Sequence, residues 1–246
     1  SKLRTAVCFR AERRTVKEMG DKNTVYNGAE LEKWDKEYVW HPFTQMKNYR
    51  EEESLIIERG EGSFLYDVKG NRYLDGVSSL WVNLHGHGRE EINKAIRNQM
   101  DKLSHSTLLG LSNVPAITLA KKLVDLSPVG LNKVFYSDNG STAVESALKI
   151  AFQYWQQRTP PKKQKYTFVS LENAYHGDTL GAVSVGGIDT FHTMYRPLLF
   201  STYQIPSPYC YRCSLGKTYP SCHLVFLMRA EDVIKQHHEV VSSLII

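Results

Sequence analysis

The sequence has little cysteine and no long apolar run. Only four of its 246 residues are cysteines, which argues against a disulfide-stapled scaffold and favours a reducing compartment, here the cytoplasm. No apolar stretch approaches the ~20 residues that cross a bilayer, so no membrane partner is expected. Composition also excludes a disordered or collagen-like chain, because 41% of residues are hydrophobic and 11% aromatic. We therefore expect a globular protein.

Basic residues exceed acidic ones only slightly, 31 to 26, for a net charge of +5. The excess gathers in the first 22 residues and around residues 160–165 rather than along one face. A nucleic-acid groove is therefore not expected. Residues 1–28 lack apolar periodicity, so they are interpreted as an extension or tag outside the fold.

Apolar periodicity divides the remainder into two parts. Residues 29–88 form an N-terminal segment with three short strands, which a small antiparallel sheet would accommodate. Residues 89–246 alternate between helices and strands, which is typical of a mostly parallel α/β sheet covered by helices on both faces. The predicted strands are 55–59, 63–67, 72–75, 134–136 and 166–171, and the helices are 89–103, 115–126, 143–157, about 178–184 and 231–240. The chain closes on an apolar run, 244–246, that resembles the start of a buried strand, so we expect it to stop inside its second domain.

The most informative segment is YSDNGSTAVESALK, residues 136–149. An apolar strand ends, turns through Asn-Gly and enters a helix, and Thr142 and Glu145 have capping-box spacing. This places the amides of Gly140, Ser141 and Thr142 at a helix N-terminus, where a phosphate or carboxylate binds readily. A plain capped helix after a tight turn is the alternative.

A second segment, ENAYHGDT, follows the next predicted strand. Its Tyr175 and His176 would lie at the carboxyl edge of the same sheet, where ligands of open α/β folds bind. An aromatic ring there can stack on a planar ligand whose phosphate lies on the preceding helix. A structural loop is the alternative for either segment alone, but two such sites on neighbouring strand ends favour a ligand.

Together these segments resemble the cofactor-binding half of class III pyridoxal-phosphate (PLP) aminotransferases, which have fold type I. The resemblance extends through WHPFTQM, DGVSSLWVNLHGH, HSTLLG and ALKIAFQYW and covers about residues 38–246. It implies that Gly140 and Ser141 hold the PLP phosphate, with Thr142 and His176 beside them, and that Tyr175 packs on the pyridine ring. Within the family the combination is similar to the branch that makes 7,8-diaminononanoate in biotin biosynthesis.

The resemblance also implies a substrate pocket, in which Trp81 forms a wall, Phe43 helps to recognise the keto substrate 8-amino-7-oxononanoate, and Tyr175 contacts substrate as well as cofactor. The best-known members have Tyr at Phe43 and a second Trp at Leu80, so two hydrogen-bond donors are missing here. The amino donor is S-adenosylmethionine or lysine, and these departures favour lysine. The intact protein is expected to be a homodimer.

PLP enzymes also need a Schiff-base lysine and an aspartate beside the pyridinium nitrogen. The resemblance places both after Ile246, and no lysine present, including Lys149, matches a catalytic position. We therefore expect the chain as given to be inactive by itself. Other interpretations are another class III ω-amino-acid aminotransferase and a non-catalytic protein of PLP-enzyme fold.

The clustered cysteines suggest one further alternative. Cys210 and Cys213 have the C-x-x-C spacing of zinc sites, and Cys222 and His223 follow eight residues later. Adjacent Cys and His residues rarely bind one metal together, so free thiols are predicted rather than a zinc-stabilised interaction module.

Overall fold

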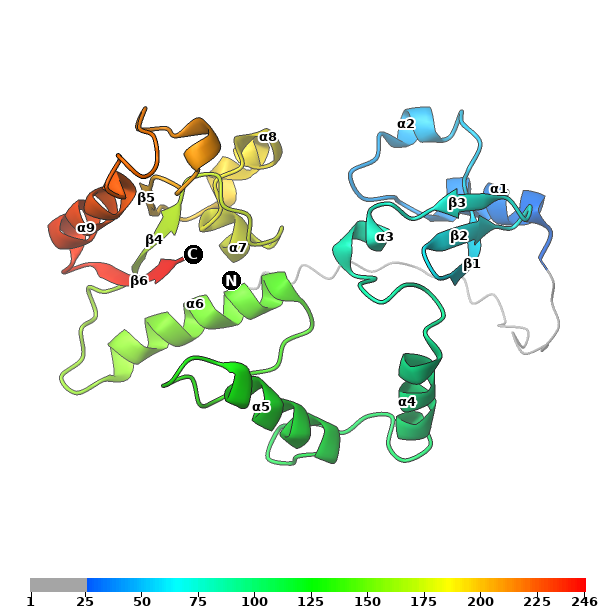
Figure 1. Cartoon of the computed structure of the whole chain (residues 1–246), viewed down its shortest axis with the longest axis horizontal. Helices are drawn as coiled ribbons and strands as arrows, with labels where there is room; N and C mark the ends of the chain where they lie inside the picture. The colour runs from blue at the N-terminus through cyan, green and yellow to red at the C-terminus, as the bar shows by residue number, and fades with distance from the viewer. Residues whose placement is uncertain (1–25) are drawn as a thin grey trace, which may run out of the picture. The chain divides into compact units, whose positions relative to one another are not determined.

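The computed structural model describes residues 26–246 (Figure 1). The chain forms two compact units, residues 1–112 and 113–246. The first unit includes helix α4 (Glu90–Met100). The expectation for residues 1–28 falls largely outside the described residues.

The first unit contains the predicted antiparallel sheet, in the order β1-β2-β3. Its strands are β1 (Ile57–Glu61), β2 (Phe64–Asp67) and β3 (Arg72–Leu74). Asp67 organises the turn between β2 and β3, because its carboxylate accepts hydrogen bonds from the backbone of Lys69 and Asn71, the Asn71 side chain and the Tyr73 hydroxyl, at 2.8–2.9 Å. Burial of Asp67 raises its pKa, but these hydrogen bonds outweigh burial and lower the pKa to about 2.

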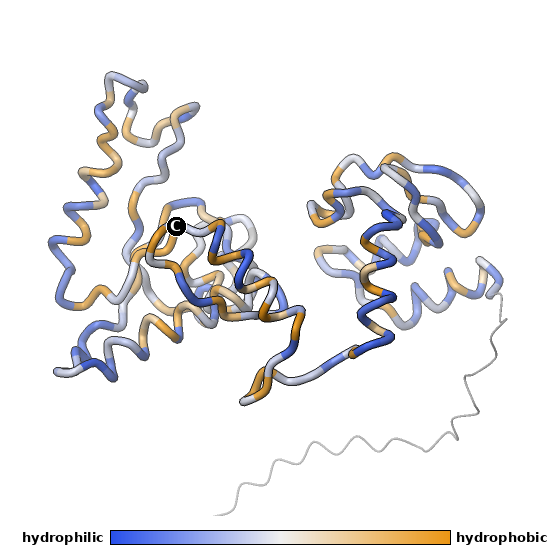
Figure 2. Tube along the Cα trace, turned by 60° about the horizontal axis from the view of Figure 1, so that its bottom comes forward, coloured by the Kyte–Doolittle hydropathy of each residue, from blue (hydrophilic) through white to orange (hydrophobic). Residues whose placement is uncertain are grey.

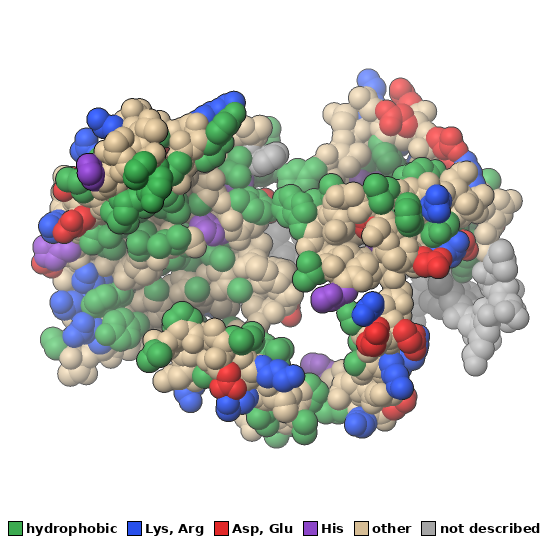
Figure 3. Space-filling view, in the orientation of Figure 1, with side chains coloured by type: hydrophobic (Ala, Val, Ile, Leu, Met, Phe, Trp, Pro, Cys, Tyr) green, Lys and Arg blue, Asp and Glu red, His purple; other side chains and the backbone are tan. Residues whose placement is uncertain are grey.

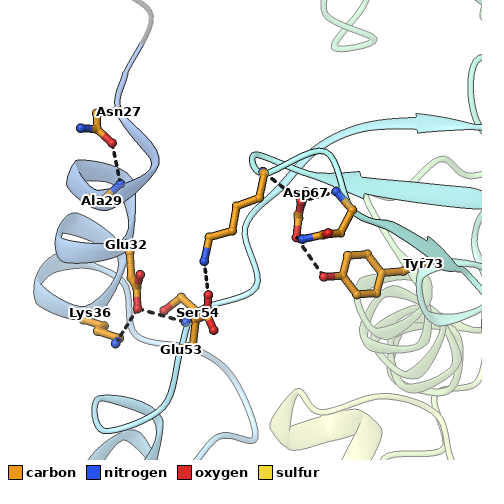
Figure 4. A network of polar contacts seen from close by, with 10 residues as sticks. Asn27, Ala29, Glu32, Lys36, Glu53, Ser54, Asp67 and Tyr73 are labelled. Atoms are coloured by element: carbon orange, nitrogen blue, oxygen red, sulfur yellow. Dashed lines mark hydrogen bonds and ion pairs between the residues drawn. The ribbon is translucent and has the colours of Figure 1, made fainter.

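Helix α1 (Gly28–Tyr38) is tied to the segment that leads into this sheet. Asn27 caps its first turn by accepting from the Ala29 amide at 3.0 Å. Glu32 accepts from Lys36 Nζ one turn later and from the Ser54 amide, at 2.8 and 3.3 Å (Figure 4). The helix and the loop before β1 are therefore linked by one carboxylate.

The short helical turn α3 (Ser78–Trp81), which follows β3, is left-handed. All four of its residues have positive φ, between 49° and 69°, and none is glycine. Left-handed backbone costs about 1–2 kcal/mol for each residue with a Cβ. Contacts from outside the turn must therefore maintain this conformation.

The second unit is built around a three-stranded parallel sheet in the order β5-β4-β6, as the alternating pattern predicted. The strands are β4 (Thr167–Leu171), β5 (Tyr203–Ile205) and β6 (Val241–Ile245). The helical segments of this unit are α5 (Val114–Leu126), α6 (Gly140–Gln157), α7 (Leu180–Ser184), α8 (Asp189–His192), η1 (Thr193–Leu198), η2 (Cys210–Arg212) and α9 (Val225–His237).

Two apolar clusters cover the two faces of this sheet. Val169 packs with Ile205 and Ala230 of α9, whereas its neighbour Phe168 packs with Leu148 of α6 and with Val185. Successive side chains of a strand point to opposite faces, so α9 and α6 cover opposite sides of β4. This confirms the predicted α/β architecture with helices on both faces.

Three local predictions were wrong. Residues 134–136 form no strand, because no neighbouring strand pairs with them and Phe135 is exposed. Helix α9 begins at Val225, six residues before the predicted start, because charged residues between 225 and 231 do not interrupt it. The capping box at α6 joins Asn139 to Thr142 rather than Thr142 to Glu145, because Asn139 occupies the cap position.

Many large apolar side chains lie at the surface of both units, as the green areas of Figure 3 show. Hydrophobic and hydrophilic segments alternate along the helices (Figure 2). Among residues 26–246, no helix is both long and apolar enough to cross a membrane.

Candidate functional site

The predicted anion seat is the N-terminus of the 18-residue helix α6. Asn139 Oδ1 accepts from the Thr142 amide at 3.0 Å, and Thr142 Oγ1 accepts from the Asn139 amide at 3.1 Å. This reciprocal cap fixes the turn. Within the described part of the chain, the amides of Gly140 and Ser141 donate to no protein acceptor, so two donors remain at the positive end of a long helix.

The structure brings the second predicted segment against this turn. Gly177, which follows Tyr175 and His176, is buried and has φ +112°. A Cβ built on Gly177 would lie 1.8 Å from Ser141 Oγ and 2.7 Å from Ser141 Cβ. Only glycine permits this approach. The two segments, 36 positions apart by the count from Ser141 to Gly177, therefore meet at one place.

A second contact joins the same two segments. Glu145, one turn further along α6, accepts a hydrogen bond from the Gly181 amide of α7 at 2.7 Å. A Cβ on Gly181 would lie 2.4 Å from the Glu145 carboxylate. Glu145 therefore holds the start of α7, and with it the Tyr175–Gly177 loop, beside α6. The spacing of Glu145 predicted a different role, a cap within its own helix.

Tyr175 and His176 differ in exposure to solvent, since the Tyr175 side chain is half exposed and His176 Nε2 is buried. The Tyr175 hydroxyl donates to Asp178 Oδ2 at 2.7 Å. This hydrogen bond raises the pKa of Tyr175 above its ordinary value. His176 Nε2 and Thr179 Oγ1 are buried and have no partner among the described residues. Buried polar atoms are normally paired, so a bound group would relieve both.

Phe43, predicted to recognise substrate, lies in the first unit and is 84% exposed. Its φ of +50° places it in the left-handed region. The preceding residues are fixed by Asp35, whose carboxylate lies 2.8 Å from His41 Nε2 and accepts from the Tyr49 hydroxyl at 2.5 Å. The exposed Phe43 side chain therefore lies on a residue with strained backbone, two positions after His41, which Asp35 holds.

Trp81 is displayed in a similar way at the end of α3 and is 78% exposed. Asp75 Oδ1 accepts from the Ser79 amide at 2.7 Å, and Oδ2 accepts from Ser79 Oγ and lies 2.8 Å from His87 Nε2. The Ser79 amide, the Ser79 hydroxyl and His87 together lower the pKa of Asp75. The sequence led us to propose Trp81 but not its two anchors, because an Asp and a His twelve residues apart form no recognisable motif.

A cavity of about 560 Å³ lies beside the sheet of the second unit. Its lining includes Asn173, Gly187, His192 and Gln204, and none of the predicted cofactor residues. The cavity and the α6 turn are therefore separate features.

The three clustered cysteines are free thiols. They line one small pocket with Tyr209 and Phe226, but no group of three or more His, Cys, Asp or Glu side chains among residues 26–246 is arranged to hold a metal ion. The described geometry gives the zinc interpretation no support.

Comparison with known proteins agrees with the geometry. Two curated relatives are named adenosylmethionine-8-amino-7-oxononanoate aminotransferase. The one from Geobacter sulfurreducens is 54% identical to this chain, and the one from Methanocaldococcus jannaschii is 53% identical. The alignments cover 90% and 88% of this chain but 49% and 48% of those proteins. The chain thus spans about half the length of the curated relatives it matches.

Solved structures give the same result. The crystal structure of the Methanocaldococcus jannaschii enzyme superposes with a TM-score of 0.78 at 51% identity, over 89% of this chain and 46% of that one. An omega transaminase from Pseudomonas jessenii in complex with PMP superposes with a TM-score of 0.78 at 29% identity, over 87% and 48%. The Aminotransferase class-III profile matches residues 46–246. The chain belongs to the class III aminotransferase family.

Proposed function

We propose that this chain is part of an aminotransferase that converts 8-amino-7-oxononanoate to 7,8-diaminononanoate in biotin biosynthesis. The observation that carries the proposal is the contact of Gly177 with Ser141, which joins the two family segments at the N-terminus of α6. The names of relatives at 53–54% identity support the choice of substrate.

Pyridoxal phosphate is the cofactor of this family, and the residues at α6 fit it. The Gly140 and Ser141 amides, which donate to no acceptor in the described part of the chain, suit a phosphate together with the Ser141 hydroxyl. His176 Nε2 and Thr179 Oγ1, which have no partner among the described residues, lie in the adjoining segment. The cofactor, when bound, supplies the electron sink for amino transfer. Gly140, Ser141 and Thr142 would hold its phosphate, while the exposed Tyr175 ring would pack on its plane.

Two aromatic residues of the first unit would form the substrate pocket. Trp81 would provide an apolar wall, since an indole offers a large contact area for an aliphatic chain. Phe43 would contribute ring area without a hydroxyl, which removes one donor that a tyrosine would offer. We propose that the amino donor is S-adenosylmethionine, which the names of the relatives at 53–54% identity include, or lysine.

The proposal is tested with the protein as its gene encodes it. The purified protein is incubated with PLP, 8-amino-7-oxononanoate and either S-adenosylmethionine or lysine, and 7,8-diaminononanoate is measured by mass spectrometry. Product with S-adenosylmethionine or with lysine is expected, and the donor that gives product identifies the source of the amino group. Absence of product with both donors would refute the proposed reaction.

A second candidate is a broader ω-transaminase. The structure of an (S)-enantioselective omega-transaminase from Thermomicrobium roseum superposes with a TM-score of 0.79 at 32% identity. Amination of simple ketones at rates above that of 8-amino-7-oxononanoate would favour this candidate.

The proposal includes a homodimer in the cytoplasm. Exposed apolar side chains such as Leu109 (89%) and Leu126 (85%) offer surface for a partner. Free thiols are compatible with a reducing compartment. Light scattering of the purified protein tests the dimer.

A further inference from the structure

Side chains outside the left-handed turn Ser78–Trp81 help to hold it, beside backbone hydrogen bonds such as that from the Trp81 amide to the Val77 carbonyl at 2.8 Å. Asp75 binds the Ser79 amide and hydroxyl, and His87 Nε2 lies 2.8 Å from the same carboxylate. The Asp75 side chain is 5% exposed and that of His87 16% exposed, whereas Trp81 is 78% exposed. A nearly buried carboxylate and a partly buried imidazole thus lie beneath a turn that carries an exposed indole.

His87 is in turn fixed by its neighbours. Asn83 Nδ2 lies 2.6 Å from His87 Nδ1 and 3.1 Å from His87 Nε2, so the Asn83 amide packs against the imidazole, while Nε2 lies 2.8 Å from Asp75 Oδ2. The backbone of His87 exchanges two hydrogen bonds with Gly62, at 2.7 and 3.0 Å. A Cβ on Gly60 would lie 2.5–2.7 Å from the His87 side chain, so strand β1 leaves a space for the ring.

We propose that Asp75 and His87 are positioning residues for Trp81, because they lock the Ser78–Trp81 turn in its left-handed form and so preset the indole at the substrate pocket. Residues held in sparsely populated backbone conformations cluster at functional sites, where their surroundings determine them. The inference rests on the proposed function for its kinetic consequence, but the locked turn itself can be tested without any reaction.

The first test uses 5-fluorotryptophan and ¹⁹F NMR on the protein as its gene encodes it. The resonance of Trp81 is assigned by its loss in Trp81→Phe. His87→Leu removes the donor, and Gly60→Ala displaces the ring; both should shift or broaden the Trp81 resonance alone. Gly76→Ala is the matched control, since its Cβ meets nothing within 4 Å. His87→Gln, which keeps a donor within reach of Asp75, should restore the native resonance.

Two outcomes would overturn the locked turn. One is an unchanged Trp81 resonance in both His87→Leu and Gly60→Ala. The other is an equal change of all tryptophan resonances in both variants, which would make the pair a general stabiliser rather than a support for Trp81.

The second test is a double-mutant cycle in the transamination assay. His87→Leu should lower kcat/KM for the keto substrate about ten- to a hundredfold, since misplacement of a positioning group has effects of this size. The loss should disappear in a Trp81→Ala background, because both changes remove the same contact. Multiplicative losses would overturn the inference. An active enzyme in which Trp81→Ala has no effect would instead refute the assignment of Trp81, while the NMR result would stand.

Discussion

Replacement of Gly177 by alanine tests whether the two family segments form one seat. The added Cβ would lie 1.8 Å from Ser141 Oγ, and the φ of +112° disfavours any residue with a side chain. Gly130 is the matched control, because its φ is +103° and its added Cβ meets nothing within 4 Å. The two variants share the backbone strain, and only one has the clash.

The magnitudes follow from this difference. Each variant should lose about 1–2 kcal/mol of unfolding free energy from the positive φ. Gly177→Ala should lose about 1–3 kcal/mol more, the usual cost of overpacking a buried site. Relief of the clash requires Ser141 or the Tyr175 loop to move, so PLP affinity should fall at least about tenfold, or about 1.4 kcal/mol.

Urea unfolding and fluorescence titration with PLP measure the two effects in the protein as its gene encodes it. We expect Gly130→Ala to bind PLP like the wild type. Equal PLP affinity of the two variants would show that Ser141 and Gly177 do not share a ligand, and equal stability would show that the contact is not tight.

Four further predictions concern single residues. Ser141→Asp should weaken PLP binding more than tenfold by placing like charge beside a phosphate; equal affinity in a titration would move the seat elsewhere. Trp81→Ala should reduce turnover of 8-amino-7-oxononanoate far more than PLP retention, and unchanged kinetics would remove it from the pocket. Asp67 has a folded pKa of about 2, below its unfolded value near 4. Its contribution to stability is therefore complete above pH ~4 and is lost as the pH falls toward ~2. A difference in unfolding free energy between the wild type and Asp67→Asn that stays constant between these pH values would contradict this. Finally, no lysine of the sequence matches the family's Schiff-base position, and Lys149 lies nine residues, or about 13 Å, along α6 from Gly140. PLP and borohydride should therefore leave no single stoichiometric pyridoxyl-lysine on the 246-residue chain, and mass spectrometry that finds one would refute this.

The sequence predicted the architecture well because the signals were periodic. Alternating strands and helices predicted the parallel sheet, and the turn at Asn139 predicted the start of α6. The failure at residues 134–136 has a physical cause, since β propensity alone provides no partner strand. The late start predicted for α9 reflects how weakly sequence marks a helix boundary without a capping side chain.

The candidate site was predictable only in part. Gly140 and Ser141 could be proposed because a turn that enters a helix has a local signature, and Tyr175 because its ring follows a predicted strand. The contact of Gly177 with Ser141 and the bond from Gly181 to Glu145 join distant segments, so only the fold reveals them. His87 was missed for the same reason, because its function depends on Asp75 and on the space at Gly60.

The left-handed turn also has a consequence for how substrate preference could change. The contacts that hold it are backbone hydrogen bonds and the bonds from Ser79 to Asp75, and none of them uses the side chains of Leu80 or Trp81. Side chains at these two positions can therefore be exchanged without rebuilding the loop that carries them. A saturation library at positions 80 and 81, with both anchors kept, should yield folded variants that differ in the ketones and donors they accept, which makes this turn a natural starting point for engineering.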